Sequence, residues 1–167
     1  MKTKKIIRIR ISMIIRYGIS IIPCLIIILA SSCSSYITLD NLKIGEKIPR
    51  EIAKSPSKQY LLTSSSDLEQ SYETTLNGIR YSIAIDENKR ITYIGSFDPD
   101  FKTEEGYSIK TTFKEIFTSI NKIELEPGWA FYVPLRLGWN AAFKLSKAGA
   151  ESKPKDDDKV GFFFKRD

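Results

Sequence analysis

The chain has 167 residues, with 26 Lys and Arg against 20 Asp and Glu, two Cys and no His. The absence of His excludes Ser-His-Asp and Cys-His catalysis and the His-based zinc motifs. We therefore expect neither a cofactor nor a metal site.

Residues 1–32 have the three parts of an export signal, namely a basic start, the apolar run 19–30 and small residues before a Cys. The tetrad Ala30-Ser31-Ser32-Cys33 resembles the lipobox of bacterial lipoprotein precursors. The resemblance implies cleavage after residue 32 and lipid on Cys33. The alternative is an uncleaved membrane helix, but the run from 17 to 30 is shorter than the roughly 20 apolar residues that a span needs. Both Met1 and Met13 fit as the start of translation.

The basic excess of the chain belongs to this signal. Six of the 26 basic residues and none of the acidic residues lie within it, so cleavage leaves 20 basic against 20 acidic residues. A net charge of zero removes the electrostatic argument for a nucleic-acid partner. The remaining residues suit a single domain that can bury a core, preceded by a flexible tether over 33–41.

The first half of the domain, about 42–101, predicts one helix and a meander. Pro49 is tolerated at the first helical position, which indicates a short helix over 49–54. Asn77-Gly78 is typical of a two-residue hairpin turn. Alternating apolar residues around this turn predict three antiparallel strands, at 72–76, 79–85 and 91–97.

The second half, about 102–167, predicts the same order. Thr112 and Glu115 form a capping box at the start of a helix with an apolar face. Three further strands are predicted at 129–137, 139–145 and 160–165, separated by a charged loop over 146–159.

Together the halves predict an α+β domain over 42–167. It consists of two repeated helix-plus-three-stranded antiparallel meander units, with the helices packed on one sheet face. This order, with the junction at 97–116, resembles the small outer-membrane assembly lipoproteins and the beta-lactamase inhibitor proteins. Those proteins bind rather than catalyse, so the resemblance implies a non-catalytic binder.

Strand parity predicts a binding surface on the face that the helices leave open. The predicted core side chains are Trp129, Phe131, Trp139, Phe143, Phe162 and Phe164. A mixture of aromatic and Arg side chains on the other face is typical of protein interfaces, although ordinary strands also expose single aromatic residues. The predicted binding residues are Tyr132, Arg136, Asn140, Phe163 and Lys165.

Four carboxylates gather in one loop, at Asp98, Asp100, Glu104 and Glu105. The loop lacks the alternating ligands and central Gly of a calcium loop, so a solvated turn is favoured. A pair of these carboxylates acting on cell-wall or surface glycan is the alternative function, a hydrolase.

We therefore expect a lipid-anchored cell-envelope lipoprotein that binds a protein or another envelope component and is not an enzyme. Its partners are the membrane, through lipid on Cys33, and an envelope protein, with no nucleic acid. Ser34 follows the Cys, and lipoproteins retained in the inner membrane usually have Asp at that position. The resemblance therefore implies the periplasmic face of the outer membrane.

Overall fold

The structure, a computed structural model, describes residues 37–54, 58–120, 122–144 and 153–166. The predicted signal, the two alternative starts and Cys33 lie outside these residues. The described residues belong to one compact unit that begins at Ile37. Within them, no helix has the length and apolar character needed to cross a membrane.

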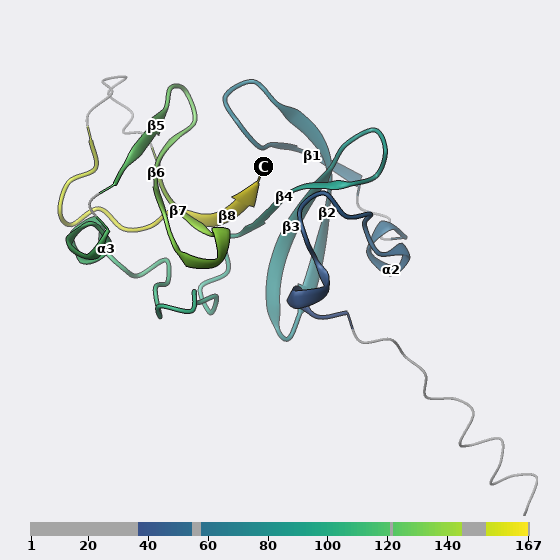
Figure 1. Cartoon of the computed structure of the whole chain (residues 1–167), viewed down its shortest axis with the longest axis horizontal. Coiled ribbons are helices and arrows are strands. Elements are labelled where there is room, and N and C mark those ends of the chain that lie inside the picture. Colours follow the sequence, from purple (N-terminus) through teal and green to yellow (C-terminus); the bar gives the residue numbers. More distant parts are fainter. Residues whose placement is uncertain (1–36, 55–57, 121, 145–152, 167) are drawn as a thin grey trace, which may run out of the picture. The chain divides into compact units, whose positions relative to one another are not determined.

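Eight antiparallel strands form one sheet in the order β1-β2-β3-β4-β8-β7-β6-β5. Two four-stranded meanders, β1 to β4 and β5 to β8, are joined where β4 pairs with β8 (Figure 1). The strands are β1 (Lys58–Leu62), β2 (Leu68–Leu76), β3 (Ile79–Ile85), β4 (Ile91–Ser96), β5 (Glu124–Glu126), β6 (Ala130–Pro134), β7 (Asn140–Lys144) and β8 (Phe162–Arg166).

The predicted fold class is wrong. The domain is not a pair of helix-plus-three-strand units, because a single sheet contains all eight strands and the described helices are short. A helix of four to seven residues cannot cover a whole sheet face. The helices are η1 (Leu39–Asn41), α2 (Arg50–Ala53), α3 (Phe113–Ser119) and η2 (Arg136–Gly138).

The strongest local predictions are confirmed. Thr112 and Glu115 form the capping box of α3, with the Thr112 side chain accepting a hydrogen bond from the Glu115 amide. Asn77 and Gly78 both have positive φ, at 52° and 83°, as a type I′ hairpin turn requires. The strands on either side of this turn pair as expected.

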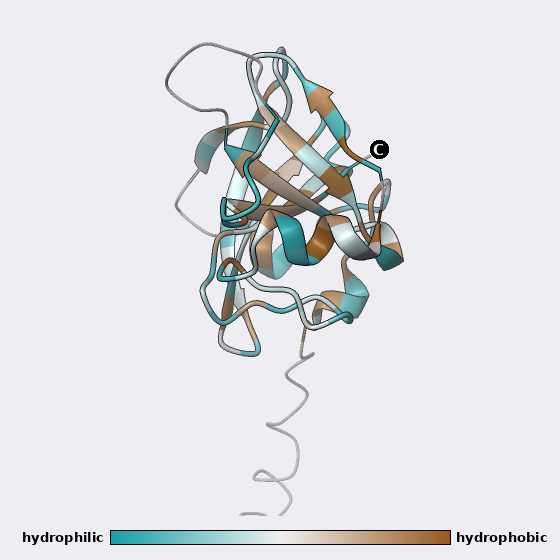
Figure 2. Cartoon of the chain, turned by 90° about the vertical axis from the view of Figure 1, so that its left-hand side faces the viewer, coloured by the Kyte–Doolittle hydropathy of each residue, from teal (hydrophilic) through white to brown (hydrophobic). Residues whose placement is uncertain are grey.

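A main core lies on the face of the sheet that the helices contact. Ile52 of α2 and Ile116 of α3 pack there with strand residues such as Ile83, Val133 and Phe163. In α3, Phe113 and Ile116 are buried whereas Lys114 and Glu115 are exposed, so this helix has one apolar and one polar side, in keeping with the alternating hydropathy of its ribbon (Figure 2). The helices are thus part of the core without forming a continuous layer.

A second apolar cluster fills the opposite face. A register shift between Ala84 and Ile85 opposite β4 lets Ile91 and Ile94 share the main core while Tyr93 joins the second cluster. The small side chains of its Ala residues leave room on this face for the neighbouring aromatic rings. The buried members are Ala84, Tyr93, Ala130, Ala142, Phe162 and Phe164.

Candidate functional site

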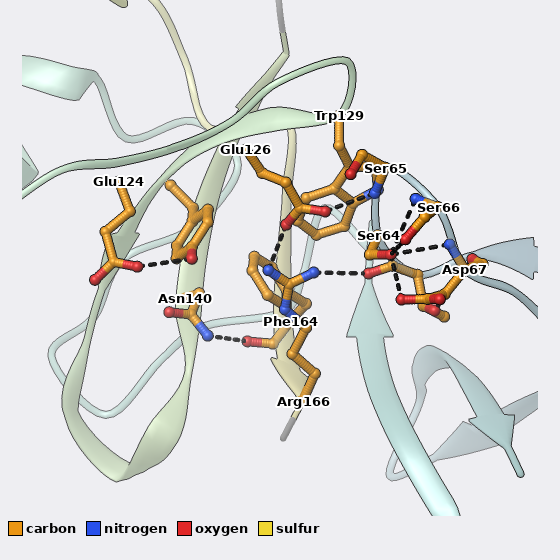
Figure 3. Close-up of polar contacts among 12 residues, drawn as sticks. Ser64, Ser65, Ser66, Asp67, Glu124, Glu126, Trp129, Asn140, Phe164 and Arg166 are labelled. Carbon is orange, nitrogen blue, oxygen red and sulfur yellow. Dashed lines mark hydrogen bonds and ion pairs between the residues drawn. The ribbon is translucent and has the colours of Figure 1, made fainter.

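The two outermost strands of the sheet approach each other at one end. Trp129 Nε1, next to β6, donates a hydrogen bond to the Leu62 carbonyl of β1 at 3.3 Å. The Ser65 amide, in the turn after β1, donates to Glu126 of β5 at 2.5 Å (Figure 3). These contacts show that the sheet curls until the end of β1 and the turn after it touch the end of β5 and the β5–β6 turn, whereas β1 and β5 do not pair with each other. We call residues 62–67 and 124–129 the seam.

Arg166 of β8 links the two sides of the seam. Its guanidinium donates to the Thr63 carbonyl at 3.0 Å and forms an ion pair with the Glu126 carboxylate (Figure 3). The guanidinium carbon also lies 4.7 Å from the centroid of the Trp129 ring. Side-chain exposure is only 22% for Arg166 and 16% for Glu126, so water screens their attraction less than at the surface.

The electrostatics of Glu126 follow from this geometry. Partial burial on its own raises the pKa of Glu126, but the hydrogen bonds from Arg166 and from the Ser65 amide outweigh it. The resulting pKa lies below the usual value of a Glu side chain. Glu126 is therefore ionised at neutral pH.

The turn from Ser64 to Asp67 is held by its own side chains. The Ser64 hydroxyl accepts hydrogen bonds from the Ser66 amide at 3.2 Å and the Asp67 amide at 2.9 Å, and donates to the Asp67 carboxylate at 2.5 Å (Figure 3). Such Ser and Asp bonds replace main-chain bonds in turns. They leave the Ser65 amide directed at Glu126.

A polar cleft of about 460 Å³ opens beside this turn. Five hydroxyl side chains, three carboxylates and one guanidinium line it, so its formal charge is negative. The hydroxyl residues are Thr63, Ser64, Ser65, Ser66 and Thr92, and the charged residues are Asp67, Glu69, Glu126 and Arg166.

Glu69 links two cleft residues that are far apart in the sequence, Thr63 and Thr92. One of its oxygens accepts hydrogen bonds from Thr63 Oγ1 at 2.9 Å and from Thr92 Oγ1 of β4 at 2.8 Å. No Lys or Arg of the described ranges forms an ion pair with it. A ligand that donates hydrogen bonds or carries positive charge suits this lining.

The structure does not bring the five predicted binding residues onto one surface. Phe163 is buried in the main core, whereas Tyr132 packs in the second cluster and donates a hydrogen bond to Glu124 at 2.7 Å. Lys165 Nζ lies 4.9 Å from the centroid of the Trp139 ring. Asn140 donates from its side chain to the Phe164 carbonyl at 3.4 Å. Of the five, Tyr132 alone packs near Arg166, whose guanidinium lies 5.5 Å from its ring centroid.

Residues 129–137 are not one strand, so the predicted alternation between the two faces does not continue to residue 137. β6 ends at Pro134, and Arg136 begins η2, in which Leu137 has a φ of 53°. In β8, Phe163 is opposite Ala141 of the main core and Phe162 is opposite Ala142 of the second cluster, so the predicted core divides between the two faces of the sheet. Phe131, Trp139 and Phe143 lie in the main core, and Trp129, Phe162 and Phe164 lie in the second cluster.

None of the four carboxylates of the acidic loop lines the cleft. Asp98 is buried, and hydrogen bonds from the Asp100 and Arg80 amides, each 3.0 Å long, lower its pKa. Glu105 accepts a hydrogen bond from the Arg136 amide at 2.8 Å. Asp100 and Glu104 are exposed. Across the part of the chain that the structure describes, no three acidic or Cys side chains are grouped to hold a metal ion.

The cleft was not among the sites that the sequence predicted. The Ser-rich run ending in Asp67 is a local signal for a side-chain-bonded turn. The contacts that make it a site are not local, because Ser65 and Glu126 are 61 positions apart and Thr63 and Arg166 are 103 positions apart.

The comparisons with known proteins establish a fold and no family. No protein-family model matches the chain, and no curated protein matches its sequence. The structure is similar to the crystal structure of the uncharacterized protein yfeY from Escherichia coli, with a TM-score of 0.52 and 16% sequence identity. The match covers 79% of this chain and 97% of that one. At this identity the likeness shows a shared fold alone.

Proposed function

We propose that this protein is a lipid-anchored, non-catalytic binding module of the cell envelope, and that the cleft at the seam is its binding site. The observation that carries the proposal is the cleft itself, a polar space of about 460 Å³ whose walls are fixed by bonds between distant parts of the chain. A fixed wall lowers the entropic cost of binding a ligand.

The carboxylates of the cleft already form hydrogen bonds or an ion pair within the protein, which favours a binding role over a hydrolytic one. Glu126 is bonded to Arg166 and Ser65, Glu69 to two Thr hydroxyls, and Asp67 to Ser64. Acid catalysis of glycan hydrolysis needs a carboxyl group with a raised pKa, whereas the pKa of Glu126 is lowered.

The lipid anchor at Cys33 is inferred from the sequence. Three residues separate Cys33 from Ile37, where the compact unit begins, and the four residue steps between them span at most about 14 Å in a fully extended chain. Ile37 and Leu39, which were assigned to the tether, pack against the main core. Lipid on Cys33 would therefore hold the domain at the membrane surface, and Ser34 favours the outer membrane.

Two measurements test this function. Mass spectrometry of the protein from its host is expected to show lipid on Cys33, and a Cys33→Ala variant is expected to leave the membrane fraction. A photo-crosslinking amino acid at Ser66, exposed on the cleft, should capture an envelope component in whole cells. The same group at Glu87, exposed in the β3–β4 turn, is the control. Identical products from both positions would refute the site.

A further inference from the structure

β1 is an edge strand, and within the described ranges it pairs with β2 alone. The Thr63 amide donates to the Asp67 carbonyl, so the main-chain groups of Thr63 face β2. Main-chain groups of an antiparallel strand alternate in direction, so those of Gln59 and Leu61 face β2 and those of Tyr60 and Leu62 face outward. The hydrogen bond from Trp129 to the Leu62 carbonyl agrees with an outward direction for that carbonyl.

An apolar patch accompanies the free main chain. Tyr60, Leu62 and Leu68 are 72%, 46% and 64% exposed, and Leu62 is directly opposite Leu68 in the hairpin. Opposite residues of an antiparallel pair share a face, and so do residues two apart in a strand. The three side chains therefore form one patch along the edge.

The chemistry of this edge indicates what covers it. Outward amides and carbonyls at strand spacing are matched by another extended chain and not by a helix or a lipid surface. Edge strands are normally protected by charges, Pro or bulges, whereas β1 has a single charge, Lys58 at its start, and the segment 59–62 has neither a charged residue nor Pro.

The charge around the edge indicates the composition of that chain. β1 runs directly into Thr63 and the cleft, where Asp67, Glu69 and Glu126 outnumber Arg166. Leu61 and Glu69 are paired opposite each other, so they lie on the cleft side of the hairpin. A second copy of this chain would present β1, in which Lys58 is the one charged residue, to the acidic cleft. A basic partner would complement it.

We propose, on the basis of the binding function above, that β1 is a docking edge for an extended basic segment of a partner protein. The segment adds to the sheet beside Gln59–Leu62, with apolar side chains over the patch and Lys or Arg side chains toward the cleft. Because the Leu62 carbonyl already accepts a bond from Trp129, the added strand ends there. A segment of about five residues fills the edge.

The test uses the purified full chain in detergent and a fluorescent peptide of alternating Val and Lys. Fluorescence anisotropy is expected to show binding that weakens as salt is raised. A peptide with Glu in place of Lys should bind at least tenfold more weakly. A Lys peptide whose alternate amides are N-methylated should not bind, since it cannot pair with a strand edge.

Two pairs of protein variants locate the site. Tyr60→Pro removes an outward amide that β2 does not use, so it should abolish binding while far-UV circular dichroism stays unchanged. Tyr60→Ala keeps the amide and should weaken binding only in part. Glu69→Gln should weaken binding about fivefold. Glu73→Gln, on the same strand but outside the cleft, should have no effect.

Three results would overturn the docking edge. They are equal peptide binding by Tyr60→Pro and wild type, no binding of the Lys peptide at low salt, or a dimer in sedimentation that Tyr60→Pro dissociates. The last result would assign the edge to a second copy. Capture of an envelope component from Ser66 together with any of these would leave the cleft function standing and remove this inference alone.

Discussion

Replacing Arg166 with Met tests whether the seam depends on one side chain. The substitution keeps much of the apolar volume over Trp129 and Phe164 and removes the charge. It leaves the Glu126 carboxylate without its ion-pair partner and the Thr63 carbonyl without its donor. The Ser65 amide remains the one other hydrogen-bond partner that the structure gives for Glu126 in the described ranges.

The expected cost follows from the burial of the pair. Removing one partner of a fully buried ion pair costs about 3–5 kcal/mol, and an exposed pair is worth under about 1 kcal/mol. Arg166 and Glu126 are 22% and 16% exposed, closer to the buried case. The lost hydrogen bond and the cation–π contact add roughly 1 kcal/mol each but overlap with the ion pair. We expect Arg166→Met to lower the free energy of unfolding by about 3 kcal/mol.

Urea unfolding of the wild type, Arg166→Met, Glu126→Gln and the double variant measures this directly. Because both single variants break the same pair, the double variant should be more stable than the sum of the single losses predicts, by about 2 kcal/mol. A loss below about 1 kcal/mol for Arg166→Met, with additive effects in the double variant, would refute the reasoning. The seam would then be held by other contacts.

Three further predictions follow from single sites. The pKa of Glu126 is lowered in the folded state, so the ionised side chain stabilises the fold above its unfolded pKa of about 4.3, and this stabilisation is lost as pH falls through the folded-state pKa. The pH midpoint of acid unfolding should therefore change in Glu126→Gln. A Cβ at Gly95 would lie 2.5 Å from Oη of the buried Tyr93, so Gly95→Ala should lower thermal stability by about 2 kcal/mol. Thr112→Ala removes the N-cap of α3 and should cost about 1 kcal/mol in urea unfolding, whereas Thr112→Ser should cost less.

The features that sequence predicted correctly are those fixed by neighbouring residues. The capping box needs only Thr112 and Glu115, and the hairpin turn needs only Asn77 and Gly78. β5 was missed because three residues are too few to show a period. β1 was missed because two polar residues, Lys58 and Gln59, are followed by Tyr60, Leu61 and Leu62, which is not an alternating pattern. Their place in the sheet depends on pairing with β2 and β6, and no local pattern encodes that pairing.

The proposed lipid anchor and the proposed binding sites depend on different parts of the chain. It depends on residues 1–36, which lie outside the described part of the chain, and on the resemblance of 30–33 to a lipobox. The cleft and the docking edge depend on residues within the compact unit. Lipid analysis of Cys33 and binding measurements on β1 therefore succeed or fail independently.

The run Phe162-Phe163-Phe164 explains why the expected open face does not exist. Successive residues of a strand point to opposite faces, so three consecutive buried Phe residues require both faces of the sheet to be covered. One face packs against the helices, and the other is filled by the ring cluster around Tyr93. Where both faces are covered, as at β8, the sheet offers a partner no open face, and the exposed apolar residues of β1 and the polar cleft lie instead at the edge of the sheet and at the seam.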